Sequence, residues 1–146
     1  TQMVQNLDFA QTILAAAQLE APADMQGENL IPLFKGETEN FREAVYYHYY
    51  EYPAVHMVKR HYGIVTEDFK LIHFYDDVDE WELIDRKNDP NELKNVIAEP
   101  EYTEVLKKLE NDLTELRIKY KDSEDLDQKY IKMYEDNNFR PSKGGK

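Results

Sequence analysis

The 146-residue sequence contains no cysteine. This absence excludes disulfides, thiolate metal sites and a cysteine nucleophile within these residues. Positive charge is also scarce, since 18 Lys and Arg stand against 30 Asp and Glu and give a formal net charge of -12. Nucleic acids and anionic membranes both select broad positive patches. We therefore expect neither a nucleic-acid partner nor a membrane partner.

Long apolar runs and targeting signals are missing as well. No run comes near the roughly 20 apolar residues that cross a bilayer, and the first residues, TQMVQNLDFA, lack the basic and apolar regions of a signal peptide. They also lack an initiator methionine, so we expect a piece of a longer chain. The residues present are 41% hydrophobic and 12% aromatic, which suffices for the core of one ordinary domain.

The order of local patterns predicts an α+β fold. NLDFAQTILAAAQLE has the apolar spacing of a helix, and a segment rich in Pro and Gly follows it. Four runs of β-forming residues then predict an antiparallel meander, in EAVYYHYYEY, RHYGIVT, FKLIHFY and EWELIDR. In the first run, alternation places Tyr47 and Tyr49 on one face and His48 and Tyr50 on the other.

Two helices are predicted after the strands. In KNDPNELKNV, Asp89 suits an N-cap and Pro90 suits the first helical position. The clearest helix is EPEYTEVLKKLENDLTELRIKYKD, whose apolar stripe consists of Tyr102, Val105, Leu106, Leu109, Leu113, Leu116 and Tyr120. We expect this helix to cover one face of the four-stranded sheet rather than to form a coiled coil. The last residues, NNFRPSKGGK, are polar and are expected to be loose.

Four segments carry a resemblance to a known family. VQNLDFAQTIL, MQGENLIPLFKGE, HYGIVTEDFKLIHFY and WELIDRKNDPNELKNV occur in the order and approximate spacing of the C-terminal part of type I sulfatases. The last segment is the most specific, because its residues match a closing motif of that family at Asp85, Asp89, Pro90, Glu92 and Asn95. The resemblance covers roughly residues 3–121. Departures from the family pattern stand at Gln11, Asn29, Val65 and Ile84.

The resemblance implies a division of labour within a longer enzyme. Sulfatases of this type use formylglycine, made from Cys or Ser in a C/S-x-P-x-R motif, together with calcium. This chain has no Cys, and its serines, Ser123 and Ser142, stand in other contexts. The resemblance thus implies no catalytic residue and no metal ligand here, with calcium and formylglycine in the parent enzyme. It also implies a periplasmic, lysosomal or secreted parent.

The same resemblance suggests three regions. Residues 1–36 would be the end of the catalytic domain with its connecting segment, and the leading helix would belong to that large domain. Residues 37–121 would be the C-terminal subdomain, made of the sheet and the long helix. Residues 122–146 would be a partly flexible extension. The implied partners are the N-terminal catalytic domain of the same chain and a sulfated saccharide, such as an N-acetylglucosamine 6-sulfate or a sulfated uronic acid.

The segment EYPAVHMVKRHYG gathers four basic side chains in an otherwise acidic chain. A sulfate ester is an anion, and cations, imidazoles and aromatic faces bind such groups. We predict that His61, His56, Arg60 and Lys59 bind substrate at one wall of the cleft. The alternative is that Lys59 and Arg60 simply pair with surface carboxylates, which contributes little to stability. A metal site at His56 and His61 lacks a third ligand.

Other conspicuous residues have structural interpretations. His48 and His73 lie in mid-strand and are expected to be packed, hydrogen-bonded side chains. The tyrosines of EAVYYHYYEY could stack on sugars, but sheet packing is the more common role. The acidic run at residues 76–80 lacks the glycine and the ligand spacing of a calcium loop, so we interpret it as a solvated turn.

Three functions remain open at this point. The first is the C-terminal subdomain of a sulfatase that acts on sulfated carbohydrate. The second is a free-standing module that binds sulfated glycans without catalysis. The third is an interaction domain that docks through the apolar stripe of residues 102–120. A phosphatase or phosphodiesterase relative is a further possibility, because the wider superfamily shares its scaffold.

Overall fold

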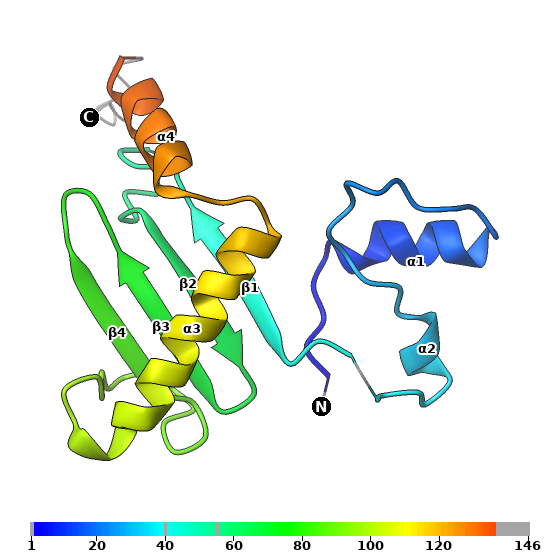
Figure 1. Cartoon of the computed structure of the whole chain (residues 1–146), viewed down its shortest axis with the longest axis horizontal. Coiled ribbons are helices and arrows are strands. Elements are labelled where there is room, and N and C mark those ends of the chain that lie inside the picture. The colour runs from blue at the N-terminus through cyan, green and yellow to red at the C-terminus, as the bar shows by residue number, and fades with distance from the viewer. Residues whose placement is uncertain (1, 40, 55, 137–146) are drawn as a thin grey trace, which may run out of the picture. The chain divides into compact units, whose positions relative to one another are not determined.

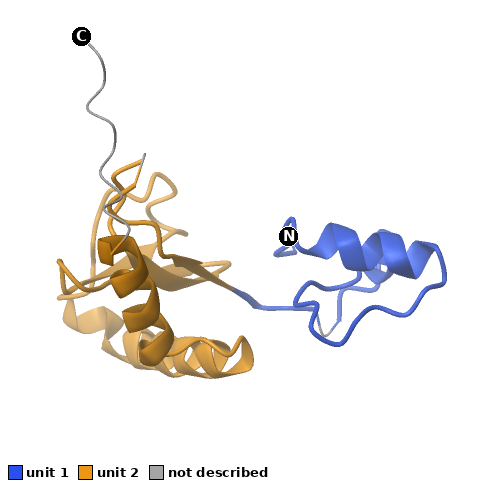
Figure 2. Cartoon of the chain, turned by 90° about the horizontal axis from the view of Figure 1, so that it is seen from above, with its two compact units in different colours: residues 1–45 blue, residues 46–146 orange. Residues whose placement is uncertain are grey.

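Figure 1 shows the computed structural model, which describes residues 2–39, 41–54 and 56–136. The chain divides into two compact units, residues 1–45 and residues 46–146, distinguished by colour in Figure 2. Among the described residues, none of the helices has both the length and the apolar content needed to cross a bilayer.

The first unit is organised around one buried carboxylate. It contains α1 (Asp8–Ala16) and the short α2 (Ile31–Phe34). Asp8 has no exposed surface, and its oxygens accept hydrogen bonds from the backbone N–H groups of Gln5 at 2.7 Å and Glu28 at 2.8 Å. Arg42 completes the set with two bonds of 2.7 and 2.6 Å. One carboxylate therefore joins the start, the loop and the end of this unit.

Gln11 and Thr12 hold the loop that follows α1. Gln11 Nε2 donates to the carbonyl oxygens of Met25 at 3.2 Å and Gly27 at 2.5 Å. Thr12 Oγ1 accepts the N–H of Leu30 at 3.0 Å. Gln11 is one of the departures from the family pattern, and these contacts explain it as a side chain that fixes the loop.

The second unit contains the predicted antiparallel sheet. Its strands are β1 (Ala44–Tyr49), whose first two residues belong to the first unit, β2 (His61–Thr66), β3 (Phe69–Phe74) and β4 (Glu80–Asp85), in the spatial order β1-β2-β3-β4. The register opposes Ile64 to Leu71 and Leu71 to Leu83. These three side chains form a row with no exposed surface, and the row lies at the centre of the core.

The predicted long helix covers this row. It is α3 (Thr103–Lys119), preceded by the 3-10 turn η1 (Pro100–Tyr102). Figure 1 shows α3 lying across the sheet, and it contacts β2 and β3. Leu109 and Leu113 of the predicted stripe are the buried residues of this helix. The α+β prediction, with a sheet covered by a long helix, is confirmed.

The prediction of a helix that starts at Asp89 and Pro90 is wrong. Residues 86–99 form turns and loop, and Glu92 has a positive φ of 53°, which a right-handed helix does not allow. The Asp89 carboxylate accepts the N–H groups of Leu93 at 2.6 Å and Lys94 at 2.8 Å. These donors lie two residues beyond the usual N-cap partners, so Asp89 closes a loop instead.

The other residues of the closing motif tie this loop to the sheet and helix. Asp85 accepts bonds from the Asn88 side chain at 2.7 Å and the Tyr102 hydroxyl at 3.0 Å. Asn95 Oδ1 accepts the N–H of Leu83 at 3.0 Å, while Glu92 pairs with Lys70 at 2.7 Å. The most specific motif of the sequence therefore stabilises the fold.

The region expected to be a partly flexible extension begins with another helix. This helix is α4 (Glu124–Asp136), and Ile131 and Asp127 are its buried residues. Asp127 is an acidic residue at a buried position, where it contacts Arg117 at 2.8 Å. The segment NNFRPSKGGK lies outside the described residues.

Candidate functional site

The predicted basic cluster lies on the connection between β1 and β2. His56 is exposed and Lys59 is half-buried, while Arg60 is 2% exposed. His61 is the first residue of β2. The residue before His56 lies outside the described part of the chain. The four basic residues are therefore in very different environments.

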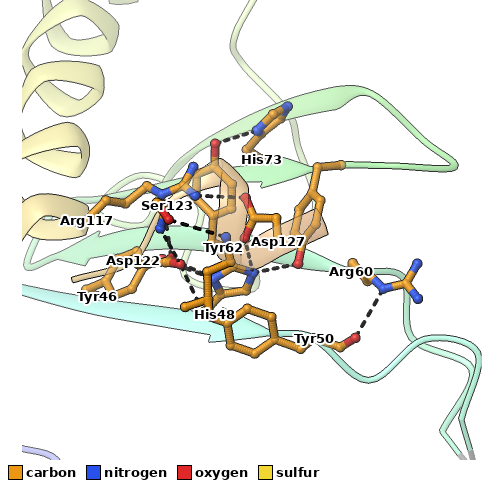
Figure 3. Close-up of polar contacts among 12 residues, drawn as sticks. Tyr46, His48, Tyr50, Arg60, Tyr62, His73, Arg117, Asp122, Ser123 and Asp127 are labelled. Atoms are coloured by element: carbon orange, nitrogen blue, oxygen red, sulfur yellow. Dashed lines mark hydrogen bonds and ion pairs between the residues drawn. The ribbon is translucent and has the colours of Figure 1, made fainter. Parts of the chain in front are cut away.

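Arg60 is fully engaged by the protein. Its Nε donates to the carbonyl oxygen of Tyr50 at 3.2 Å (Figure 3). Its two terminal nitrogens donate to the carbonyl oxygen of Tyr52 and to the carboxylate of Asp76. A single guanidinium thus joins both ends of the β1–β2 connection to the turn after β3.

Lys59 is held in a more open setting. Its Nζ donates to the carboxylate of Asp77 and, at 2.7 Å, to the Tyr52 hydroxyl. The hydrogen bond that Lys59 donates to Asp77 raises the pKa of the Lys59 amine. The alternative considered from the sequence, pairing of both cations with carboxylates, is thus what the structure contains. Asp76 and Asp77 belong to the acidic turn, so this turn supplies the counter-ions of the loop.

His61 sits in an aromatic cluster on the face of the sheet opposite α3. Its ring packs against Tyr47, Tyr49 and Phe74 at centroid distances of 5.6, 5.7 and 5.2 Å. Its Nδ1 lies 2.8 Å from the carbonyl oxygen of Lys59. The substrate-binding role of His61, His56, Arg60 and Lys59 stays a prediction.

A second cluster, which the sequence did not reveal, joins β1 to the start of α4 (Figure 3). His48 Nδ1 lies 2.7 Å from Asp122 Oδ2, and its Nε2 lies 2.6 Å from the Tyr75 hydroxyl and 3.6 Å from Asp127 Oδ1. Arg117, from the end of α3, contacts Asp127 at 2.8 Å and Asp122 at 3.6 Å. We call His48, Arg117, Asp122 and Asp127 the ionic cluster.

Tyrosines surround the ionic cluster. The hydroxyls of Tyr46 and Tyr50 both donate to Asp122. The Arg117 guanidinium lies 3.9 Å from the centre of the Tyr62 ring, a geometry favourable for a cation–π contact. The sequence prediction that His48 and His73 are packed and hydrogen-bonded is confirmed. His73 stacks on Trp81 at 4.1 Å and its Nδ1 lies 2.8 Å from the Tyr62 hydroxyl.

The two carboxylates of the cluster have opposite pKa shifts. Burial works to raise the pKa of Asp122, but hydrogen bonds from His48 and Tyr46 outweigh it and lower that pKa to about 2. Burial raises the pKa of Asp127 above its ordinary value, and Arg117 compensates only in part. Asp127 Oδ1 is buried without a hydrogen-bond partner among the described residues, whereas Asp122 accepts several hydrogen bonds.

The ionic cluster contains a histidine and two carboxylates, which are side chains that can bind a metal ion. His48, Asp122 and Asp127 can offer ligand atoms that lie within 4.8 Å of one another. However, the Arg117 guanidinium already supplies positive charge to both carboxylates. The Tyr75 hydroxyl also occupies the position beside His48 Nε2. We therefore interpret the cluster as a structural connection between the sheet, α3 and α4.

The cluster escaped the sequence analysis because its partners are distant in sequence. His48 and Asp122 are 74 positions apart, and no periodicity links them. A local signal was nevertheless present in DSEDLD: Ser123 accepts the N–H of Leu126 at 3.3 Å, as a helix-capping serine does. A serine at this position indicates the start of a helix, so this signal would have predicted α4. Ser123 therefore has a structural role, and Ser142 lies outside the described residues.

A family model described as "N-sulphoglucosamine sulphohydrolase, C-terminal" matches residues 1–119. The sequence is also 52% identical over 122 residues to an N-acetylglucosamine-6-O-sulfatase of Bacteroides thetaiotaomicron, covering 82% of this chain and 22% of that protein. The match to the family model ends at the last residue of α3, so α4 lies beyond it.

Solved structures show the same fold. One is a protein in complex with its substrate D-glucosamine-2-N,6-O-disulfate, with a TM-score of 0.77 and 52% identity over 80% of this chain and 24% of that chain. Another is the phosphonate monoester hydrolase of Agrobacterium radiobacter, with a TM-score of 0.66 and 25% identity over 82% of this chain and 26% of that chain. This chain spans about a quarter of the length of such proteins.

Proposed function

Because this chain belongs to the family of N-sulphoglucosamine sulphohydrolase C-terminal domains, we propose that it is the C-terminal part of a sulfatase. The substrate class we propose is a saccharide with a sulfated glucosamine unit. The observation that carries the proposal is the 52% identity to an N-acetylglucosamine-6-O-sulfatase. By the same observation we propose the 6-O-sulfate as the group removed.

We propose that the part of this chain in the enzyme is to bind and orient the saccharide. We propose that the connection between β1 and β2 forms one wall of the substrate cleft. Its exposed residues include His56, Met57 and Val58, and an imidazole can donate a hydrogen bond to a sugar hydroxyl or to a sulfate oxygen. His61 would add an aromatic and hydrogen-bonding surface at the start of β2.

Lys59 and Arg60 have different roles in this proposal. Both side chains are engaged by carboxylates of the turn after β3. Lys59, which keeps 38% of its side chain exposed, can turn toward an anionic substrate. Arg60, with 3% of its side chain exposed, would lose three protein contacts if it did so. We therefore propose that Arg60 is a positioning residue that holds the loop.

The chemical step belongs to other residues of the longer protein. Formylglycine requires a Cys or Ser in its own motif, and the described serine of this chain, Ser123, caps α4. We propose that formylglycine and calcium are carried by an N-terminal catalytic domain, which would be the partner of this domain. Calcium, when bound there, would stabilise negative charge on the sulfate.

The test is sulfate release by the full-length protein, after mass spectrometry has verified formylglycine. The substrates are N-acetylglucosamine 6-sulfate, glucosamine 6-sulfate and N-sulfoglucosamine, with matched phosphate and phosphonate esters for comparison. We expect sulfate release from the 6-O-sulfated sugars and none from the 146-residue chain alone. Turnover of the phosphonate ester without any sulfate release would overturn the proposal and favour the chemistry of the phosphonate hydrolase relative.

A further inference from the structure

A hollow of about 410 Å³ lies beside the end of β1, and its walls come from the last residues of that strand, the two residues after it and α4. Its volume is within the range of about 300–1,000 Å³ that is usual for small-molecule sites. The described lining residues are His48, Tyr49, Tyr50, Glu51, Tyr130 and Tyr134. The hollow thus depends on a helix that lies beyond the family match, and the family relationship does not account for it.

The lining has a distinctive chemistry. Four of the six described lining residues are tyrosines, one is a histidine and one is a glutamate. Aromatic rings offer flat apolar surfaces with a polar edge, which suits the C–H face and the hydroxyl rim of a sugar ring. Neither lysine nor arginine is among the described lining residues, and the nearby Arg60 guanidinium, which donates to the Tyr50 carbonyl oxygen, is already paired with Asp76. A sulfated ring would therefore meet the Glu51 carboxylate, and the described lining offers no unpaired cation to compensate for it.

The walls of the hollow are already fixed in position. The Tyr50 ring is stacked on His48 at 3.6 Å and contacts the Tyr130 ring at 4.4 Å. His48 in turn belongs to the ionic cluster, which holds the start of α4 against the sheet. A ligand would therefore meet a preformed surface and would not need to order it, which lowers the cost of binding.

One residue of the lining, Tyr49, has an unsatisfied polar atom. The Tyr49 hydroxyl is buried and has no hydrogen-bond partner among the described residues. A buried hydroxyl without a partner is unfavourable. The Tyr49 ring is stacked on His61 at 5.7 Å, so this hydroxyl belongs to the aromatic cluster around His61 and is not counted as part of the binding surface.

We propose that this hollow binds an unsulfated sugar ring. The assignment of the ligand to saccharides rests on the proposed function, in which the substrate is a sulfated glycan. The hollow is a subsite for a ring of that glycan that carries no sulfate. The two lining tyrosines of α4, Tyr130 and Tyr134, stack on the sugar ring, and Glu51 accepts hydrogen bonds from its hydroxyl groups.

The test is a binding titration of the 146-residue chain, which needs no sulfatase activity. N-acetylglucosamine is titrated while the tyrosine ring resonances are followed by NMR, with N-acetylglucosamine 6-sulfate and tetramethylammonium as comparison ligands. We expect saturable shifts of the tyrosine signals with N-acetylglucosamine and at least tenfold weaker binding of its 6-sulfate. Saturable shifts only with tetramethylammonium would identify a site for organic cations and overturn the proposal.

Two variants test the assignment to this hollow. Tyr134→Ala removes an aromatic wall, and Glu51→Gln keeps the shape of the side chain while removing its charge. We expect both to weaken binding of N-acetylglucosamine at least fivefold. Lys132→Ala, an exposed change on the same helix, is the control and should bind like the unchanged protein. Equal binding by Glu51→Gln, Tyr134→Ala and the control would overturn the proposal, even if the sulfatase activity were established.

Discussion

Asp122 and Asp127 show how differently two neighbouring carboxylates can be treated by one fold. Both are largely buried, with 4% and 7% of their side chains exposed. Asp122 accepts bonds from His48, Tyr46 and the backbone of Ser123, whereas Asp127 depends mainly on Arg117. Hydrogen bonds to the charged form lower a carboxyl pKa, and burial without enough of them raises it. The two residues therefore contribute to stability with opposite dependence on pH.

The pKa of Asp122 leads to a prediction about acid unfolding. A folded-state pKa of about 2, below the ordinary value near 3.9, means that Asp122 stabilises the fold above about pH 4. This contribution is lost as the pH falls from about 4 to 2. We expect Asp122→Asn to lower the free energy of unfolding by about 2 kcal/mol at pH 7. Urea unfolding at several pH values measures this.

Asp127→Asn provides the comparison for that experiment. Because burial raises the pKa of Asp127, its charged form is unfavourable above its unfolded pKa, and protonation relieves this cost as the pH falls. We expect Asp127→Asn to destabilise the protein less than Asp122→Asn at pH 7. A larger loss for Asp127→Asn than for Asp122→Asn would contradict this account of the cluster.

Sequence reasoning predicted individual side chains only as far as local spacing allowed. It placed His48 correctly as a packed strand residue, because alternation along a strand is a local property. It could not supply the identity of its partners, since Tyr75 and Asp122 lie 27 and 74 positions away. The same limit applied to Arg60. Its pattern suggested an anion-binding residue, but its three acceptors are set by the tertiary fold.

At the scale of elements, the sequence predicted what periodicity encodes. The four strands and α3 were predicted because alternation and a helical stripe each extend over several residues. The helix expected at Asp89 failed because Asp and Pro suit loops as well as helix starts. The positive φ at Glu92 is incompatible with a right-handed helix, so this segment is a loop. Helix α4 was missed because its residues were assigned to a polar extension.

The connection between β1 and β2 is the element that Arg60 holds together. Its guanidinium has three acceptors, and a lysine cannot reproduce that planar fork. We expect Arg60→Lys to lower the free energy of unfolding by about 1–3 kcal/mol, the usual cost of leaving buried polar groups unpaired. In the full-length enzyme it should raise KM more than it lowers kcat, because a loosened wall binds saccharide less well.

The matching control for Arg60→Lys lies on the surface. Lys87 pairs with Asp68 at 3.5 Å, with 68% of its side chain exposed, and exposed pairs of this kind contribute little. Urea unfolding and steady-state kinetics should therefore leave Lys87→Ala unchanged. If Arg60→Lys behaved like Lys87→Ala in both measurements, the positioning role of Arg60 would be refuted.

For the whole molecule, the acidic chain and its basic segment can now be considered together. The chain has a net charge of -12, and two of its carboxylates, Asp76 and Asp77, neutralise the cations of the β1–β2 connection. The other two basic residues of this segment are His56 and His61. Among the described contacts, neither of them pairs with a carboxylate. The sequence found the cluster, but only the fold separates its supporting members from its candidate ligands.

The central claim is that this domain forms a wall of the cleft for a sulfated saccharide. Its most direct test is kcat/KM of the full-length enzyme on its 6-O-sulfated sugar, comparing His56→Ala and His61→Ala with the surface variant Lys87→Ala. We predict losses of transition-state stabilisation of about 1–3 kcal/mol for the histidine variants, the scale of a hydrogen bond to a charged group. Unchanged kcat/KM in both histidine variants would contradict the claim.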